Sequence, residues 1–127
     1  MCEGDVSMLV KKGKKIKEFL AGDHSILKEL LHPEKDGIEL GYSIAMARIN
    51  PGATTLKHRL KSSEVYYILQ GRGIMHIDKE SSMVEKGDLI YIPPASTQRI
   101  ENTGDEELVF LCIVSPPWKK EDEEILE

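Results

Sequence analysis

The stretch from His58 to Gly73, "HRLKSSEVYYILQGRG", combines a candidate strand with a candidate turn. Its centre, "VYYIL" at 65–69, consists of β-branched, aromatic and aliphatic residues, which favour strands. Gly71 and Gly73 follow, and glycine supplies the backbone freedom that a tight turn requires. In a continuous strand, positions an even number apart share a face. The stretch therefore predicts one strand face that carries His58, Leu60, Glu64, Tyr66 and Ile68, unless the polar "KSS" at 61–63 bends the chain.

Further short apolar runs lie on both sides of this stretch, and turn residues separate them. They are "YSIAMARI" at 42–49, "IMHID" at 74–78, "DLIYI" at 88–92 and "ELVFLCIVS" at 107–115. The Gly, Pro and Asn residues between them are typical of turns. This spacing indicates an antiparallel sandwich or barrel rather than alternating strands and helices. The chain is therefore predicted to be all-β.

The segment "DHSILKELLHP" at 23–33 fits two structures. Its apolar residues follow a helical stripe, Asp23 could cap such a helix, and Pro33 could end it. A helical turn is also compatible with residues 14–21, just before Gly22. From the residues alone, both helix and strand stay open for 23–33.

Length and composition limit the classes of protein to which the chain can belong. Its 127 residues suffice for one domain with a buried core, and 40% apolar residues with 31% charged residues indicate a globular protein. The net charge of −5 offers no basic face for nucleic acid, and the basic run at 11–17 is short and solvated. No apolar run approaches the ~20 residues that span a membrane, and the N-terminus lacks the apolar core of a signal peptide. We therefore expect no membrane partner, no nucleic-acid partner and a cytoplasmic location.

We expect a flexible N-terminus at 1–12, one domain at 13–117 and an acidic segment at 118–127. The last of these reads as a tail or a short helix that Trp118 anchors to the domain. The two cysteines, Cys2 and Cys112, have no CxxC partner and are expected to be free thiols. Cys112 stands within "LVFLCIV" and is expected to pack as a small core residue.

The spacing of glycine, histidine and glutamate residues around the opening stretch resembles that of a known family. Gly52, five residues, His58, then Glu64, six residues and Gly71 resemble the first motif of the cupin superfamily. The later stretch "GDLIYIPPASTQRIEN" at 87–102 resembles the second motif. The chain is most similar to small, mostly prokaryotic cupins, marked by "HRLKSSEVYYIL", "IYIPP", "ENTG" and "FLCIV". The resemblance implies a small antiparallel β-barrel of the jelly-roll, or double-stranded β-helix, type. It also implies that 23–33 begins the barrel as a strand, with the motif core at 52–102.

The resemblance also implies a set of site residues, of which two depart from the family's pattern. A typical cupin holds a metal ion with three histidines and one glutamate, and here the matching positions are His58, Leu60, Glu64 and Gln98. Leu60 cannot bind a metal, and the neutral amide oxygen of Gln98 is a weak ligand. The expected metal site is therefore His58, Glu64 and Gln98, atypical and weak, for a divalent ion such as Mn, Fe, Ni or Zn. Ala95 stands where the second motif usually has glycine.

The expected ligand pocket consists of His58, Leu60, Glu64, Tyr66 and Gln98. A carboxylate that faces a barrel interior needs a partner or a raised pKa, and His58 could pair with Glu64 without a metal for proton transfer. No catalytic residue is assigned.

Four residues outside this pocket also carry expectations. His76 is a candidate substitute ligand, and His32 is expected to be exposed to solvent. Arg99 is expected to point outward, and Asn102 to fix a turn.

Three functions remain open at this point. The first is a cupin that binds a small polar molecule, a sugar derivative or an organic acid. The second is a metal-dependent isomerase or dioxygenase. The third is a structural or interaction module with a filled barrel, since fold alone does not choose among functions. Val65, Tyr67 and Leu69 would lie on the face opposite Glu64, and an uncovered apolar face there is best closed by a homodimer.

Overall fold

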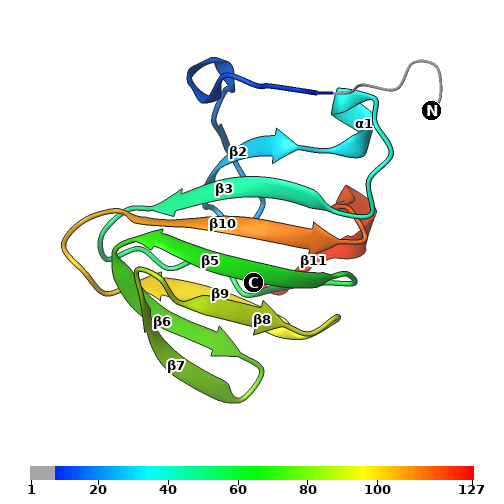
Figure 1. Ribbon diagram of the computed structural model, residues 1–127. Helices are drawn as coiled ribbons and strands as arrows, with labels where there is room; N and C mark the ends of the chain where they lie inside the picture. Colours follow the sequence, from blue (N-terminus) through cyan, green and yellow to red (C-terminus); the bar gives the residue numbers. More distant parts are fainter. Residues whose placement is uncertain (1–7) are drawn as a thin grey trace.

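A computed structural model describes residues 8–127 and contains two antiparallel sheets that face each other. One sheet has the order β1 (Phe19–Leu20), β2 (Ile26–Leu31), β3 (Ser43–Ile49), β10 (Leu108–Ser115), β5 (Ser63–Gln70) and β8 (Leu89–Ile92). The other has the order β11 (Glu123–Ile125), β4 (His58–Leu60), β9 (Thr97–Asn102), β6 (Arg72–Ile77) and β7 (Glu80–Glu85). Figure 1 shows the two layers, with the β6–β7 hairpin projecting at one end. The predicted all-β barrel is confirmed.

In residues 8–127, helical structure is confined to three short turns: η1 (Gly13–Lys15), α1 (Pro33–Asp36) and η2 (Lys120–Asp122). Among the described residues, no helix is long and apolar enough to cross a membrane. Residues 1–7, with Cys2 and most of the expected flexible terminus, lie outside the described part of the chain. Within the rest of that terminus, the Lys11 ammonium pairs with the Asp36 carboxylate at 3.0 Å.

The part of the opening stretch that was expected as one strand, 58–70, forms two strands. Strand β4 (His58–Leu60) belongs to one sheet and β5 (Ser63–Gln70) to the other, and the chain bends between them at 61–62. The polar residues of "KSS" make this bend, and the Ser62 hydroxyl donates to the Pro116 carbonyl at 2.8 Å. His58 and Glu64 therefore reach the interior from opposite sheets, not from one continuous strand.

Gly71 makes the tight turn that returns the chain from β5 to the other sheet in β6. Its φ is 86°, and a Cβ at this position would lie 2.8 Å from the Glu107 carbonyl oxygen. A side chain here would be both strained and in collision with backbone. The glycine identified in the first motif is thus required at this point of the barrel.

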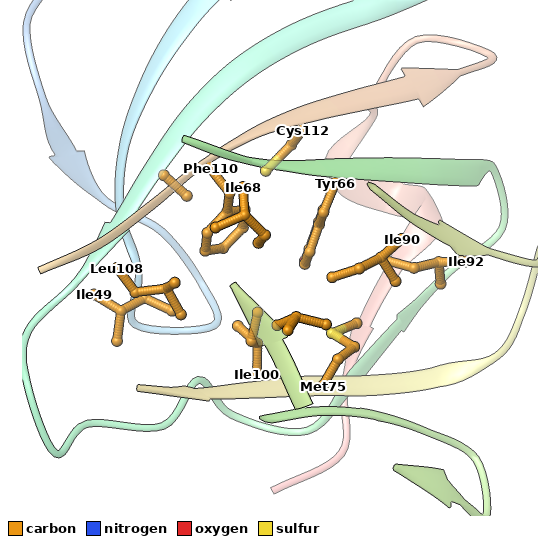
Figure 2. Packing of buried hydrophobic residues seen from close by; sticks show 12 residues of the cluster. Ile49, Tyr66, Ile68, Met75, Ile90, Ile92, Ile100, Leu108, Phe110 and Cys112 are labelled. Carbon is orange, nitrogen blue, oxygen red and sulfur yellow. The ribbon is translucent and has the colours of Figure 1, made fainter. Parts of the chain in front are cut away.

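The core lies between the sheets, and Figure 2 shows its packing. Its most deeply buried side chains, each at most 1% exposed, are Ile68, Ile92, Ile100, Leu108 and Phe110. The rings of Tyr66 and Phe110 pack with centroids 4.5 Å apart. Cys112 is a free, buried thiol beside them, as expected. Burial alternates along β10 and β5, so these residues form strands whose inner faces fill the barrel.

The ambiguous segment at 23–33 forms strand β2, and the strand expectation is confirmed. Leu27 stands opposite Ala47 of β3, so backbone pairing and burial against the sheet outweigh the helical spacing. Of residues 14–21, expected as a helical turn, only Lys14 and Lys15 are helical, in the 3-10 turn η1, and Phe19–Leu20 form strand β1 instead.

The last ten residues are more ordered than a tail. After η2, strand β11 pairs with β4, with Glu123 opposite Leu60 and Ile125 opposite His58. Trp118 anchors this segment through its backbone, since its N–H donates to the Ser43 hydroxyl at 2.9 Å. The C-terminal segment thus completes the edge of the sheet that carries His58.

His32 is buried, at 6% exposure, so its predicted exposure is wrong. Its Nδ1 accepts from the Glu34 N–H at 3.1 Å and caps helix α1, and its Nε2 bonds the Trp118 carbonyl at 2.8 Å. The polar sequence around His32 did not indicate a partner 86 residues away.

Asn102 fixes a turn as predicted, because its amide donates to the Ile49 and Glu106 carbonyls.

Candidate functional site

A cavity of about 460 Å³ lies within the barrel, beside the apolar core. The residues that line it come from β1 and the β1–β2 turn, from β2, α1, β3, β4, β5 and β10, and from the C-terminal segment. Four of the five expected pocket residues line it, namely His58, Leu60, Glu64 and Tyr66. Gln98 does not line the cavity and instead lies behind Glu64 and Tyr66.

His58 points inward from β4 and is 4% exposed. Its Nδ1 lies 2.9 Å from the Leu56 carbonyl oxygen. A carbonyl oxygen can only accept, so Nδ1 carries the proton, and Nε2 of the neutral ring is an acceptor. Nε2 lies 3.8 Å from Asp23 Oδ2, which is too long for a hydrogen bond.

Asp23 enters the site from the β1–β2 turn. The sequence predicted no site role for Asp23, only a possible helix cap. Its Oδ1 accepts from the Ser25 N–H at 3.0 Å and from the Ser25 hydroxyl at 2.7 Å, which leaves Oδ2 toward His58. An Asx turn in "GDHS" before a strand is a local signal that fits this conformation. Its approach to His58, however, depends on the tertiary fold.

A chain of hydrogen bonds joins the two sheets behind the cavity wall. The Gln98 amide donates to Glu64 Oε1 at 3.1 Å, and the Tyr66 hydroxyl donates to Gln98 Oε1 at 2.8 Å. All three side chains are buried, and Gln98 stands opposite His58 in the register of β4 and β9. The nitrogen and the oxygen of the Gln98 amide therefore both serve to orient neighbouring side chains, Glu64 and Tyr66.

Burial controls the ionisation of the groups along this wall. It raises the pKa of Glu64 to about 7, against the lowering effects of the Gln98 hydrogen bond and of His58. Near neutral pH, both the carboxylic acid and the carboxylate of Glu64 are populated. Burial also raises the pKa values of Tyr66, Cys112 and Glu123. The phenol of Tyr66 therefore stays protonated and remains a donor.

The side chains at this site do not provide the ligands that the expected metal centre requires. Within residues 8–127, no group of three or more His, Cys, Asp or Glu side chains is placed to hold a metal ion. The oxygen of Gln98 is already occupied by the Tyr66 hydroxyl, and Leu60 fills another ligand position with an apolar side chain. A divalent ion would therefore find too few protein ligands here.

Two further expectations need correction. Within the described chain no hydrogen bond joins His58 to Glu64, because Glu64 is bonded to Gln98 and His58 faces Asp23. His76 cannot substitute as a ligand, since its ring bonds Ser81 Oγ at 2.7 Å and lies 3.4 Å from Glu101, away from the cavity lining. Arg99 stands opposite His76 in the β6–β9 register and shares that outer face.

Comparison with known proteins agrees with this architecture. The family model for the cupin domain matches residues 45–114, and the chain belongs to this family. An uncharacterized protein of Methanocaldococcus jannaschii is 48% identical over 115 residues, which cover 89% of this chain and 90% of that protein.

Two proteins of Thermotoga maritima are also similar to this chain. An oxalate-binding protein from this organism is 28% identical over 92 residues, which cover 72% of this chain and 71% of that protein. The crystal structure of a predicted oxalate decarboxylase, also from this organism, superposes with a TM-score of 0.74 at 23% identity. That superposition covers 85% of this chain and 99% of the other. The likeness in structure supports the fold.

The raised pKa of Glu64 predicts a pH-dependent loss of stability. The folded state holds the proton more tightly than the unfolded state, in which the pKa is 4.5, so stability falls as pH rises from about 4.5 to about 7. The loss is about 3 kcal/mol in the free energy of unfolding. Glu64→Gln removes this dependence, so the variant gains stability relative to the native protein between pH 5 and pH 8. Urea unfolding at both pH values measures the gain.

Glu80→Gln, an exposed change on β7, is the matched control and leaves the pH dependence of stability unchanged. A difference between the Glu64→Gln variant and the native protein that is the same at both pH values would show that Glu64 is not the titrating group.

Proposed function

We propose that this protein binds a small polar molecule in the barrel cavity, with His58 and Glu64 as its principal polar contacts. The observation that carries the proposal is the cavity of about 460 Å³, a size typical of small-molecule sites, lined by buried polar side chains and an apolar wall. A module with a filled barrel would leave no such space. The cupin fold and the oxalate-binding relative support a binding role.

The lining favours a hydroxylated molecule such as a sugar derivative over a simple organic acid. Carboxylic side chains of Asp23, Glu64 and Glu123 line the cavity, and carboxylates repel an anionic ligand in a poorly solvated site. A sugar hydroxyl can donate to these oxygens and can also accept from a protonated Glu64. Leu60, Phe110 and Val114 offer apolar surface to the C–H groups of such a ligand.

Binding is tested by titrating the purified protein with neutral sugar derivatives and with small organic acids while amide NMR spectra are recorded. We expect neutral sugar derivatives to shift resonances of the cavity lining and to raise the melting temperature in proportion to ligand excess. His58→Ala should weaken binding about tenfold or more, because it removes a buried polar contact. His76→Ala, on the outer face of the barrel, should leave it unchanged. Equal effects of the two variants would contradict the proposal.

We propose that this binding does not require a metal, because the protein supplies too few ligands to one ion. We expect the protein to retain less than one equivalent of Mn²⁺, Fe²⁺, Ni²⁺ or Zn²⁺ per chain after dialysis, with little change in melting temperature. Elemental analysis measures the bound metal. A full equivalent that is lost in both His58→Ala and Glu64→Ala would instead support the metal-dependent isomerase or dioxygenase.

We propose that the outer face of the β5–β8 sheet forms a homodimer. Tyr67 and Leu69 are 39% and 36% exposed, and Leu89 and Tyr91 beside them are 64% and 58% exposed. An apolar patch of this kind on an edge of a sheet is best covered by a second copy. The cytoplasmic location stays a prediction from the sequence.

The dimer is tested by light scattering during size-exclusion chromatography. The native protein should have twice the mass of one chain. Tyr67→Glu places a charge in the proposed interface and should give monomers, whereas Met83→Glu, on the opposite sheet, should remain dimeric. A monomeric native protein would overturn this assignment.

A further inference from the structure

Positive and negative groups are unevenly distributed around the cavity. Its lining includes four carboxylic residues, Asp23, Glu29, Glu64 and Glu123, and two lysines, Lys35 and Lys120. Lys35 is 65% exposed and pairs with Glu29 at 2.9 Å, and Lys120 is exposed. The lysines therefore stand in solvent at the boundary of the cavity, and the buried part is acidic apart from His58.

Two acceptor atoms on largely buried side chains face each other at the cavity, with no protein donor between them in the described chain. His58 Nε2 and Asp23 Oδ2 are 3.8 Å apart, and their side chains are 5% and 11% exposed. Within the described chain Nε2 has no hydrogen-bond partner, because the proton of the ring is on Nδ1 and is donated to Leu56. Both side chains line the cavity, and within residues 8–127 no fully buried side-chain nitrogen or oxygen lacks a hydrogen-bond partner. The two acceptors therefore reach the cavity space and are open to a ligand that donates to both atoms.

The two acceptor atoms require two hydrogen-bond donors, which favours a nitrogen group on the ligand. One hydroxyl carries a single proton and can serve only one of the two acceptors, whereas a primary ammonium carries three N–H donors and a positive charge. Hydrogen bonds of about 2.8–3.1 Å from one nitrogen can reach both atoms. A metal ion needs its ligands at about 2.0–2.2 Å, and no group of three or more ligands within residues 8–127 is so placed.

We propose that the ligand carries a primary ammonium group that is bound between His58 Nε2 and Asp23 Oδ2, as in a small amino alcohol or an amino sugar. This inference rests on the proposed function of the cavity and narrows the class of molecule that it takes. Asp23 is the residue that selects for charge, and Glu64 and Glu123 add to the attraction of a cation only in their ionised forms. The hydroxyl groups of the ligand then lie toward the rest of the lining.

Ethanolamine, ethylene glycol and glycolate form a matched set of probes, since they share a two-carbon frame and one hydroxyl and differ in the second polar group. The experiment titrates each probe into ¹⁵N-labelled full-length protein and follows the His58 ring nitrogens and the amide resonances of 22–25. We expect ethanolamine to bind most tightly and to perturb these signals. Glycolate should bind most weakly. Glucosamine should likewise bind more tightly than glucose.

Asp23→Asn and Glu101→Gln each remove one negative charge, the first inside the cavity and the second on the outer face. An asparagine at 23 keeps an oxygen for Ser25, so the turn is retained, and an amide spectrum with native dispersion checks this. Asp23→Asn should weaken ethanolamine binding about tenfold, the size of a charge-assisted hydrogen bond, and Glu101→Gln should not change it.

Preference for glycol or glycolate over ethanolamine would overturn the inference, as would unchanged ethanolamine binding in Asp23→Asn or no binding of ethanolamine at millimolar concentrations. The proposed function fails separately, when His58→Ala leaves the binding of neutral sugar derivatives unaltered. Binding of neutral sugars alone, lost in His58→Ala, would therefore retain the binding site and reject the ammonium.

Discussion

The hydrogen bonds from Tyr66 through Gln98 to Glu64 connect the two sheets at the boundary between the solid core and the cavity. Phe110 packs against Tyr66, and both side chains belong to the core as well as to the wall of the cavity. The nitrogen and the oxygen of the Gln98 amide each have a side-chain partner, so this connection holds Glu64 and Tyr66 in place. The carboxyl of Glu64 is thereby fixed in a place where burial makes its protonation sensitive to neutral pH.

Much of the barrel could be predicted from the sequence, because its strands are short apolar runs bounded by Gly and Pro. The motif glycines located the β5–β6 turn, and the alternation of Glu64, Tyr66 and Ile68 placed them on the inner face. Strands β7 and β11 were missed, since "ESSMVE" and "EEI" are too polar to indicate burial. Their pairing is decided by neighbouring strands rather than by their own composition.

The site could be predicted only in part, for a similar reason. The motif positions brought out His58, Leu60, Glu64 and Tyr66, which all line the cavity. The partner of His58 could not be found in this way, because Asp23 lies in a turn 35 positions earlier and meets it only after folding. Gln98 was expected to supply a metal with its oxygen, and its position in the motif carried no information about Tyr66 as a competing donor.

Both ends of the described chain contribute to the wall of the cavity. Asp23 comes from the turn after β1, and Trp118 and Glu123 come from the segment that ends in β11. The bond between His32 and Trp118 ties these two ends together. The wall of the cavity is therefore complete only when β11 has paired with β4. Without β11, strand β4 would keep only β9 as a neighbour, and the wall of the cavity would lose Glu123.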